Sequence, residues 1–162
     1  MIIQKPILKH PTNCSIEEIK SFKELVELNE QANAQRVPEA ELLAFLHNEH
    51  GQLIAVGAIK NPTLQYREKV FLTKAGVTHE SENWPMFEIG FFSILPDFQR
   101  KGLGRHILQT LLNEMPKTSL FATTGNTGMK NLLMEQGFTI TGNSWSPQRG
   151  NAPLSLFIRC VS

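Results

Sequence analysis

The segment LPDFQRKGLGRHILQTLL combines two glycines and three basic residues at one junction. An apolar run precedes the junction and an amphipathic pattern follows it, so the spacing predicts a strand, a glycine-bearing turn and a helix. The first N–H groups of a helix have no internal partner and carry partial positive charge. Gly102 and Gly104 would let a ligand approach this backbone closely. Arg100, Lys101 and Arg105 add full positive charge, and the combination favours an anion such as a pyrophosphate.

Two common phosphate-binding motifs do not fit this segment. A Walker A loop needs Gly-x-x-x-x-Gly-Lys-Ser/Thr, and the chain contains no such stretch. A dinucleotide fingerprint needs a third glycine where this chain has Ile107. A turn of purely structural value and a patch that binds nucleic acid remain as alternative interpretations.

Periodicity and capping residues predict the elements that would position this segment. Ser15 and Glu18 fit a capping box, and the apolar face behind them predicts a helix to about Asn33. Gly137 suits the left-handed position after a later helix. The whole pattern is a mixed α/β layout around one sheet. The expected strands are 2–9, 42–47, 53–59, 87–95, 120–124, 138–141 and 154–161, and the expected helices are 15–33, 64–74, 103–115 and 127–136.

Length, composition and charge limit the class of protein. At 162 residues the chain is expected to form a single domain over 1–162, and 41% hydrophobic residues are enough for a packed core. A net charge of +1 argues against a dedicated nucleic-acid partner, which would need a concentrated basic surface. The chain start does not resemble a signal peptide, and no run approaches the roughly 18 apolar residues of a spanning helix. We therefore expect a soluble, cytoplasmic protein without a membrane partner.

The cysteines and histidines do not have the spacing of metal ligands, so no metal is expected. Cys14 and Cys160 are expected to be reduced thiols, with a disulfide between them as the alternative. Neither has a histidine partner that would make it a nucleophile, and burial is the common fate of such residues. His106 falls in the first turn of the helix expected over 103–115, where a surface role is the simplest interpretation.

The pattern Gln99-x-x-Gly102-x-Gly104 resembles the signature (Gln/Arg)-x-x-Gly-x-(Gly/Ala) of the GNAT superfamily of N-acetyltransferases. The stretch 94–104 is similar to that family's strand-to-helix crossing, and 126–138 (NTGMKNLLMEQGF) is similar to its later helix. The resemblance covers roughly residues 40–161. It implies one acyl-CoA N-acyltransferase domain with a mixed central sheet, splayed central strands and helices on both faces.

The resemblance also implies acetyl-CoA as the cosubstrate. Its pyrophosphate would be held by the turn and the helix start, through Gln99, Arg100, Lys101, Gly102, Leu103, Gly104 and Arg105. The strand carrying Phe92, Ser93 and Ile94 would bulge, and its freed backbone groups would hydrogen-bond the pantetheine arm. Asn126 matches a position whose side chain commonly contacts the cofactor, although a helix N-cap explains this asparagine equally well.

Glu88 is the candidate general base. Acetyl transfer requires a neutral amine, so a base must remove a proton directly or through water. The stretch around Glu88 resembles the histone-acetyltransferase branch of the family, which carries its glutamate base six residues before the position of Ile94. A carboxylate at an exposed strand end, merely solvated, is the alternative. His79, Glu80 and Glu82 are further candidates from the preceding loop.

The usual general acid of the family is missing from its expected position in this sequence. Many family members have a tyrosine four residues before the Gly-Phe pair, and here that position is Leu133. Tyr66 is the only tyrosine in the chain, so either Tyr66 supplies the proton, or water does, or CoA leaves as the thiolate. A structural Tyr66 with its hydroxyl at the surface is the alternative.

These observations predict an N-acetyltransferase acting on a primary amine by direct attack in a ternary complex. A small-molecule amine is favoured over a protein or peptide amine, and an acyl group longer than acetyl stays open. Trp145 could stack on the acceptor or pack over the core. A non-catalytic acyl-CoA-binding regulatory domain is the alternative function, for which Leu133 is the main support. A monomer or a homodimer fits the sequence equally.

Overall fold

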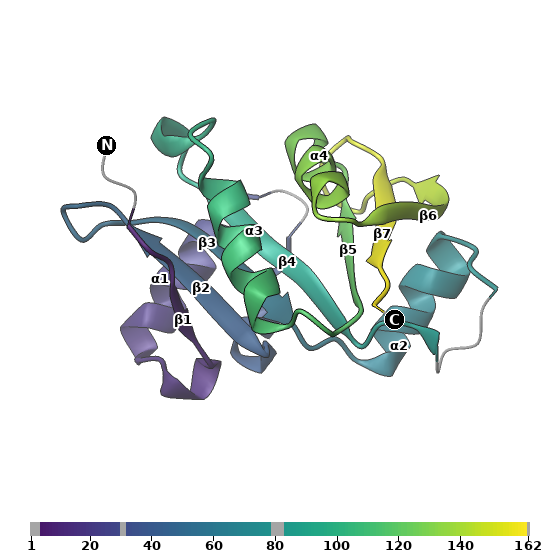
Figure 1. Ribbon diagram of the computed structural model, residues 1–162, viewed down its shortest axis with the longest axis horizontal. Helices are drawn as coiled ribbons and strands as arrows, with labels where there is room; N and C mark the ends of the chain where they lie inside the picture. Colours follow the sequence, from purple (N-terminus) through teal and green to yellow (C-terminus); the bar gives the residue numbers. More distant parts are fainter. Residues whose placement is uncertain (1–3, 30–31, 79–82, 162) are drawn as a thin grey trace. The chain divides into compact units, whose positions relative to one another are not determined.

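A computed structural model describes residues 4–29, 32–78 and 83–161. Within them seven strands hydrogen-bond in the order β1-β2-β3-β4-β5-β7-β6, with β4 and β5 parallel and the other recorded pairs antiparallel. This confirms the predicted mixed α/β fold (Figure 1). The strands are β1 (Ile7–Lys9), β2 (Leu42–His47), β3 (Leu53–Lys60), β4 (Phe87–Ile94), β5 (Leu120–Thr124), β6 (Thr139–Trp145) and β7 (Leu154–Arg159), and the α-helices are α1 (Ile16–Val26), α2 (Leu64–Glu68), α3 (Leu103–Glu114) and α4 (Thr127–Glu135).

The chain divides into two compact units, residues 1–60 with 90–116 and residues 61–89 with 117–162. The strand β4 contributes to both, because its first residues belong to the second unit and its last residues to the first. Pairing between β4 and β5 consists of Phe87 with Leu120 and Glu88 with Phe121. The prediction of one domain over the whole chain stays a prediction.

In the first unit, α1 and α3 cover opposite faces of the strands. Successive residues of a strand point to opposite faces, and Phe45 of β2 is paired with Val56 of β3 on one of them. Both belong to the core cluster that includes Phe22 of α1. Gly57 points the other way, where an added Cβ would lie only 2.7 Å from Ile107 Cγ2 of α3. Glycine at this position therefore lets α3 approach the sheet closely (Figure 1).

The second unit has its own core around β5 and β7. Phe121 is buried there against the stacked rings of Phe71 and Trp84, whose centroids are 4.8 Å apart. Phe71 belongs to a π-helical segment, Lys69–Lys74, that directly continues α2. The helix predicted over 64–74 therefore exists, with its second half wound more widely.

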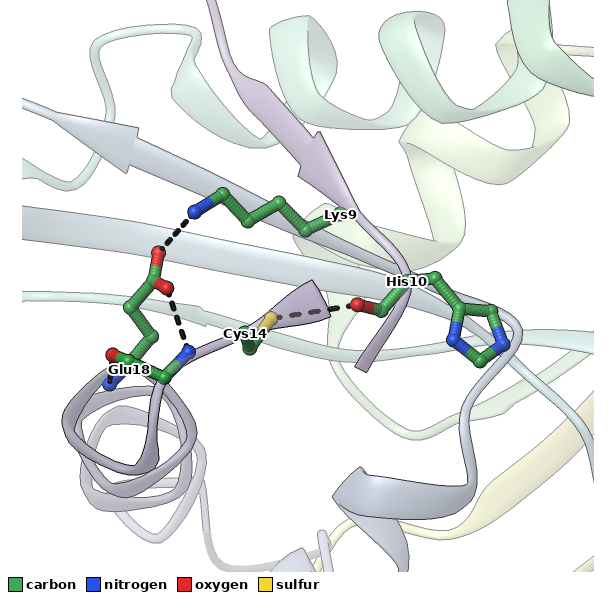
Figure 2. A network of polar contacts seen from close by, with 5 residues as sticks. Lys9, His10, Cys14 and Glu18 are labelled. Atoms are coloured by element: carbon green, nitrogen blue, oxygen red, sulfur yellow. Dashed lines mark hydrogen bonds and ion pairs between the residues drawn. The ribbon is translucent and has the colours of Figure 1, made fainter. Parts of the chain in front are cut away.

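The predicted capping box starts α1, and an ion pair reinforces it. Ser15 Oγ accepts the N–H of Glu18 at 3.1 Å, and Glu18 Oε1 accepts the N–H of Ser15 at 2.9 Å. Lys9 Nζ reaches the other Glu18 oxygen at 2.7 Å (Figure 2). The Lys9 hydrogen bond, followed by that of Ser15, holds the pKa of Glu18 below its ordinary value. This contact ties the end of β1 to the start of α1.

Several boundaries differ from the prediction. The helix expected to continue to Asn33 ends at Val26, where the N–H groups of Leu28 and Asn29 bond the carbonyls three residues earlier. Beyond this turn the side-chain amide of Asn29 donates to the Phe92 carbonyl of β4 at 3.2 Å. The first strand begins at Ile7 among the described residues. Both cysteines are free thiols, as expected. The expectation of burial is wrong for Cys160, which is exposed, while Cys14 is half-buried beside the His10 carbonyl (Figure 2).

No helix in the described part of the chain is long and apolar enough to cross a membrane.

Candidate active site

A tight turn joins the end of β4 to α3, and it contains the segment 99–105 that was predicted to bind an anion and that we call the cradle. The short 3-10 turn Pro96–Phe98 leads out of the strand, and Gln99 folds back so that its side-chain amide donates to the Ile94 carbonyl at 3.1 Å. Two positive φ angles follow, 62° at Arg100 and 78° at Gly102. Gly102 is the N-cap of α3, so the chain turns directly into the helix.

The cradle presents backbone N–H donors and exposed positive charge. The backbone N–H groups from Arg100 to Gly104 form no hydrogen bond within the described residues. The side chains of Arg100, Lys101 and Arg105 are exposed. Space for a ligand is also present at Gly102, where an added Cβ would meet no atom within 4 Å. These groups fit a pyrophosphate, since helix N-termini and neighbouring cations stabilise negative charge.

The strand that leads to the cradle is irregular where a bulge was expected. Phe91 has a φ of 58°, a conformation that is unusual and strained for a large side chain. Its ring is held in the first unit's core, packed edge-on against Phe22. The irregularity directly precedes Phe92 and the buried Ser93. Roles of Phe92, Ser93 and Ile94 in holding a pantetheine arm stay predictions.

Glu88 is the buried carboxylate of the second unit. Only 2% of the residue is exposed, so the alternative of a solvated strand end is wrong. Its Oε2 accepts the Tyr66 hydroxyl at 3.1 Å and lies 3.4 Å from the Thr123 hydroxyl. The strand β4 thus supplies the carboxylate, while α2 and β5 supply the two hydroxyl groups. No sequence pattern singled out Thr123 as a site residue.

Tyr66 therefore faces the candidate base, and the interpretation of a surface hydroxyl is wrong. Burial raises the pKa of Tyr66 well above its ordinary value, and the negative charge of Glu88 and the hydrogen bond to it add to this. At neutral pH the phenol keeps its proton and can act as a donor.

The titration of Tyr66 can be observed directly because it is the only tyrosine. We expect the phenolate absorbance of the native protein to develop well above pH 10.0, and to move back toward that value in Glu88→Gln. The unfolded state then loses the proton first, so the stability linked to this group is complete below about pH 10 and is lost as pH rises through the folded pKa. Native titration near 10.0 would show that the hydroxyl is not held by Glu88.

Other predicted site residues have structural contacts that explain them. Asn126 is the N-cap of α4 and its Oδ1 accepts the N–H of Met129 at 2.9 Å. Leu133 is fully buried, so the position of the usual tyrosine is part of the core here. Trp145 packs at the edge of the second unit's core. His79, Glu80 and Glu82 lie outside the described residues.

No group of three or more potential metal ligands occurs among the residues that the structure describes. Arg67, next to Tyr66 on α2, is a buried charged residue that the sequence pattern did not single out. Gln65 and Glu68 on the same helix are exposed, and an arginine between polar residues has no local pattern that indicates burial.

The family model of the acetyltransferase (GNAT) family matches residues 14–138. The chain belongs to this family. No curated protein matches it in sequence. Membership in the GNAT family supports acyl transfer as the general activity, and it confirms the resemblance drawn from Gln99, Gly102 and Gly104.

Several solved structures share the fold at low sequence identity. An acyl-CoA N-acyltransferase from Pseudomonas aeruginosa is 14% identical with a TM-score of 0.68, and the match covers 98% of this chain and 100% of that one. ElaA of Escherichia coli is 11% identical with a TM-score of 0.67, and the match covers 98% of this chain and 99% of ElaA. The third structure is a phosphinothricin acetyltransferase of the GNAT superfamily from Sinorhizobium meliloti, solved in complex with AcCoA. It is 16% identical with a TM-score of 0.64, and the match covers 98% of this chain and 90% of that one.

Proposed function

We propose that the protein is an acetyl-CoA-dependent N-acetyltransferase whose acceptor is a primary amine, with a small molecule favoured over a protein or peptide. The observation that carries the proposal is the buried Glu88 carboxylate with its hydrogen bond from Tyr66, located on the strand that leads into the cradle. Family membership supports acyl transfer, and the AcCoA complex of the Sinorhizobium meliloti relative supports the choice of donor.

The cradle residues supply the binding of the donor. The backbone N–H groups from Arg100 to Gly104 would hold the pyrophosphate, and the three exposed cations nearby would balance its charge. When bound, acetyl-CoA supplies the acetyl group and a thiolate leaving group. Gln99 positions this turn through its bond to the Ile94 carbonyl.

Glu88 and Tyr66 would manage the protons of the reaction. Glu88 accepts a proton from the acceptor ammonium, which frees the nitrogen lone pair to form the new C–N bond while the C–S bond breaks. Tyr66 keeps its proton at neutral pH and is suited to donate it to the leaving thiolate. The proton on Glu88 can then return to Tyr66 across their 3.1 Å hydrogen bond. Nitrogen loses two protons between ammonium and amide: one reaches the sulfur through Glu88 and Tyr66, and the second is released to water after the C–N bond has formed.

The test is a steady-state assay of free thiol release from acetyl-CoA with a panel of primary amines. We expect amine-dependent release, with formation of one acetylated amine for each CoA detected by mass spectrometry. Tight acetyl-CoA binding with no release for any amine, peptide amines included, would favour the non-catalytic regulatory domain. Salt-sensitive binding to DNA or RNA in place of acetyl-CoA binding would favour a nucleic-acid function.

A further inference from the structure

Arg67 is a charged residue on the inward side of α2. Val70 and Phe71, three and four residues further along, are buried in the second unit's core, and this spacing places side chains on one side of a helical segment. Arg67 is only 9% exposed, although Gln65 and Glu68 on the same short helix are exposed. A guanidinium thus occupies a place where the pattern calls for an apolar side chain.

The guanidinium has no partner within the described residues. Its Nε is buried without a hydrogen bond, and its side chain forms no ion pair or other hydrogen bond there. Arginine can lay its stem along apolar surface while the head stays in water, but the low exposure leaves little water around this head. Buried charges in proteins are normally paired, so Arg67 has the properties of a group whose partner is a ligand.

We propose that Arg67 binds an anionic oxygen pair on the acceptor, so that the substrate is an amine that also carries a carboxylate. Arginine presents parallel N–H donors that match the two oxygens of a carboxylate. Arg67 directly follows Tyr66, whose hydroxyl donates to the Glu88 carboxylate, so the anion site lies on the same short helix as the candidate proton donor. This inference rests on the proposed N-acetyltransferase function, because it names the substrate class of that site.

The experiment compares free L-amino acids with the matching L-amino acid amides, which keep the amine and lose the negative charge. In the wild-type protein we expect higher kcat/KM for the carboxylate-bearing member of each pair. In Arg67→Gln the kcat/KM of the free amino acid divided by that of its amide should fall at least tenfold, mainly because KM for the free amino acid rises. The ratio for Arg67→Lys should lie between those of the wild type and Arg67→Gln, because lysine keeps the positive charge but loses the paired N–H donors of the guanidinium.

Lys69→Gln is the matched control, since it removes an exposed positive charge two residues away and should leave the ratio unchanged. An unchanged ratio in Arg67→Gln, or preference of the wild type for amides, would overturn the inference. A rise in the acetyl-CoA dissociation constant of Arg67→Gln would also overturn it, by assigning Arg67 to the donor.

Two readouts separate this inference from the proposed function. If no amine of the panel is acetylated, the proposed function fails for this class, and the anion site is tested by binding: free amino acids should raise the urea midpoint of the wild type but not of Arg67→Gln. The second readout is Arg67→Met, which replaces the charge with an apolar side chain of similar length. A midpoint at or above that of the wild type is expected, and a clear drop would show that the partner of Arg67 lies within the protein.

Discussion

Glu88→Gln lowers kcat by about 10²- to 10⁴-fold, the usual contribution of a positioned general base. The substitution keeps an oxygen that can accept the Tyr66 and Thr123 hydroxyls, so the local structure should persist. The loss should be greatest at low pH, where nearly all of the acceptor amine carries a proton. At high pH the amine is already neutral, and the variant should recover part of the wild-type rate. Measurement of kcat and kcat/KM across this pH range, at saturating acetyl-CoA, tests the prediction.

The control for Glu88→Gln is Glu68→Gln, which removes an exposed carboxylate from α2 and should leave the rate unchanged. Acetyl-CoA affinity should be nearly the same in both variants, because neither residue belongs to the cradle. A Glu88→Gln rate equal to that of the wild type would exclude Glu88 as the base. A loss that is uniform across pH would point to a role in binding the acceptor instead.

Gly102→Val weakens acetyl-CoA binding by at least about tenfold, equivalent to roughly 1.4 kcal/mol. The φ of 78° at Gly102 is strained for any side chain and most of all for a β-branched one. Its added Cβ meets no protein atom within 4 Å, so it would occupy space that a ligand needs to reach the helix N-terminus. Calorimetric titration of the variant with acetyl-CoA measures the effect.

Gly51→Val provides a closely matched control. Gly51 also has a φ of 78° and also has no atom within 4 Å of an added Cβ, but it lies in the turn between β2 and β3. Both substitutions should cost similar stability through backbone strain, whereas only Gly102→Val should weaken binding. Equal affinities for acetyl-CoA in the two variants would contradict the cradle assignment.

Much of the fold is predictable from short-range signals in the chain. The capping box at Ser15 and the left-handed Gly137 after α4, whose φ is 90°, follow from local hydrogen bonding and from backbone freedom. The strand β5 has the predicted bounds, 120–124, because its apolar run is bounded by turn residues. The turn and the helix start at the cradle were predictable for the same reason, since the glycines that shape them are adjacent in sequence, and the binding role of the cradle stays a prediction.

The parts that could not be predicted depend on contacts between residues far apart in the chain. Just after the early end of α1, Asn29 donates to the carbonyl of Phe92, 63 residues away. The contact of Tyr66 with Glu88 spans 22 residues, and nothing in the helix predicted over 64–74 indicates what the Tyr66 ring faces. Thr123 and Arg67 were missed because a threonine in a strand and an arginine among polar residues have no distinctive local pattern.

The most direct test of the account is a calorimetric titration of the purified protein with acetyl-CoA, CoA and ATP side by side. We expect tight binding of acetyl-CoA and CoA and much weaker binding of ATP, because the chain has no Walker A loop and the cradle fits the CoA pyrophosphate. Absence of CoA binding would contradict the central claim, and the turn from Gln99 to Gly104 would then be a structural turn only.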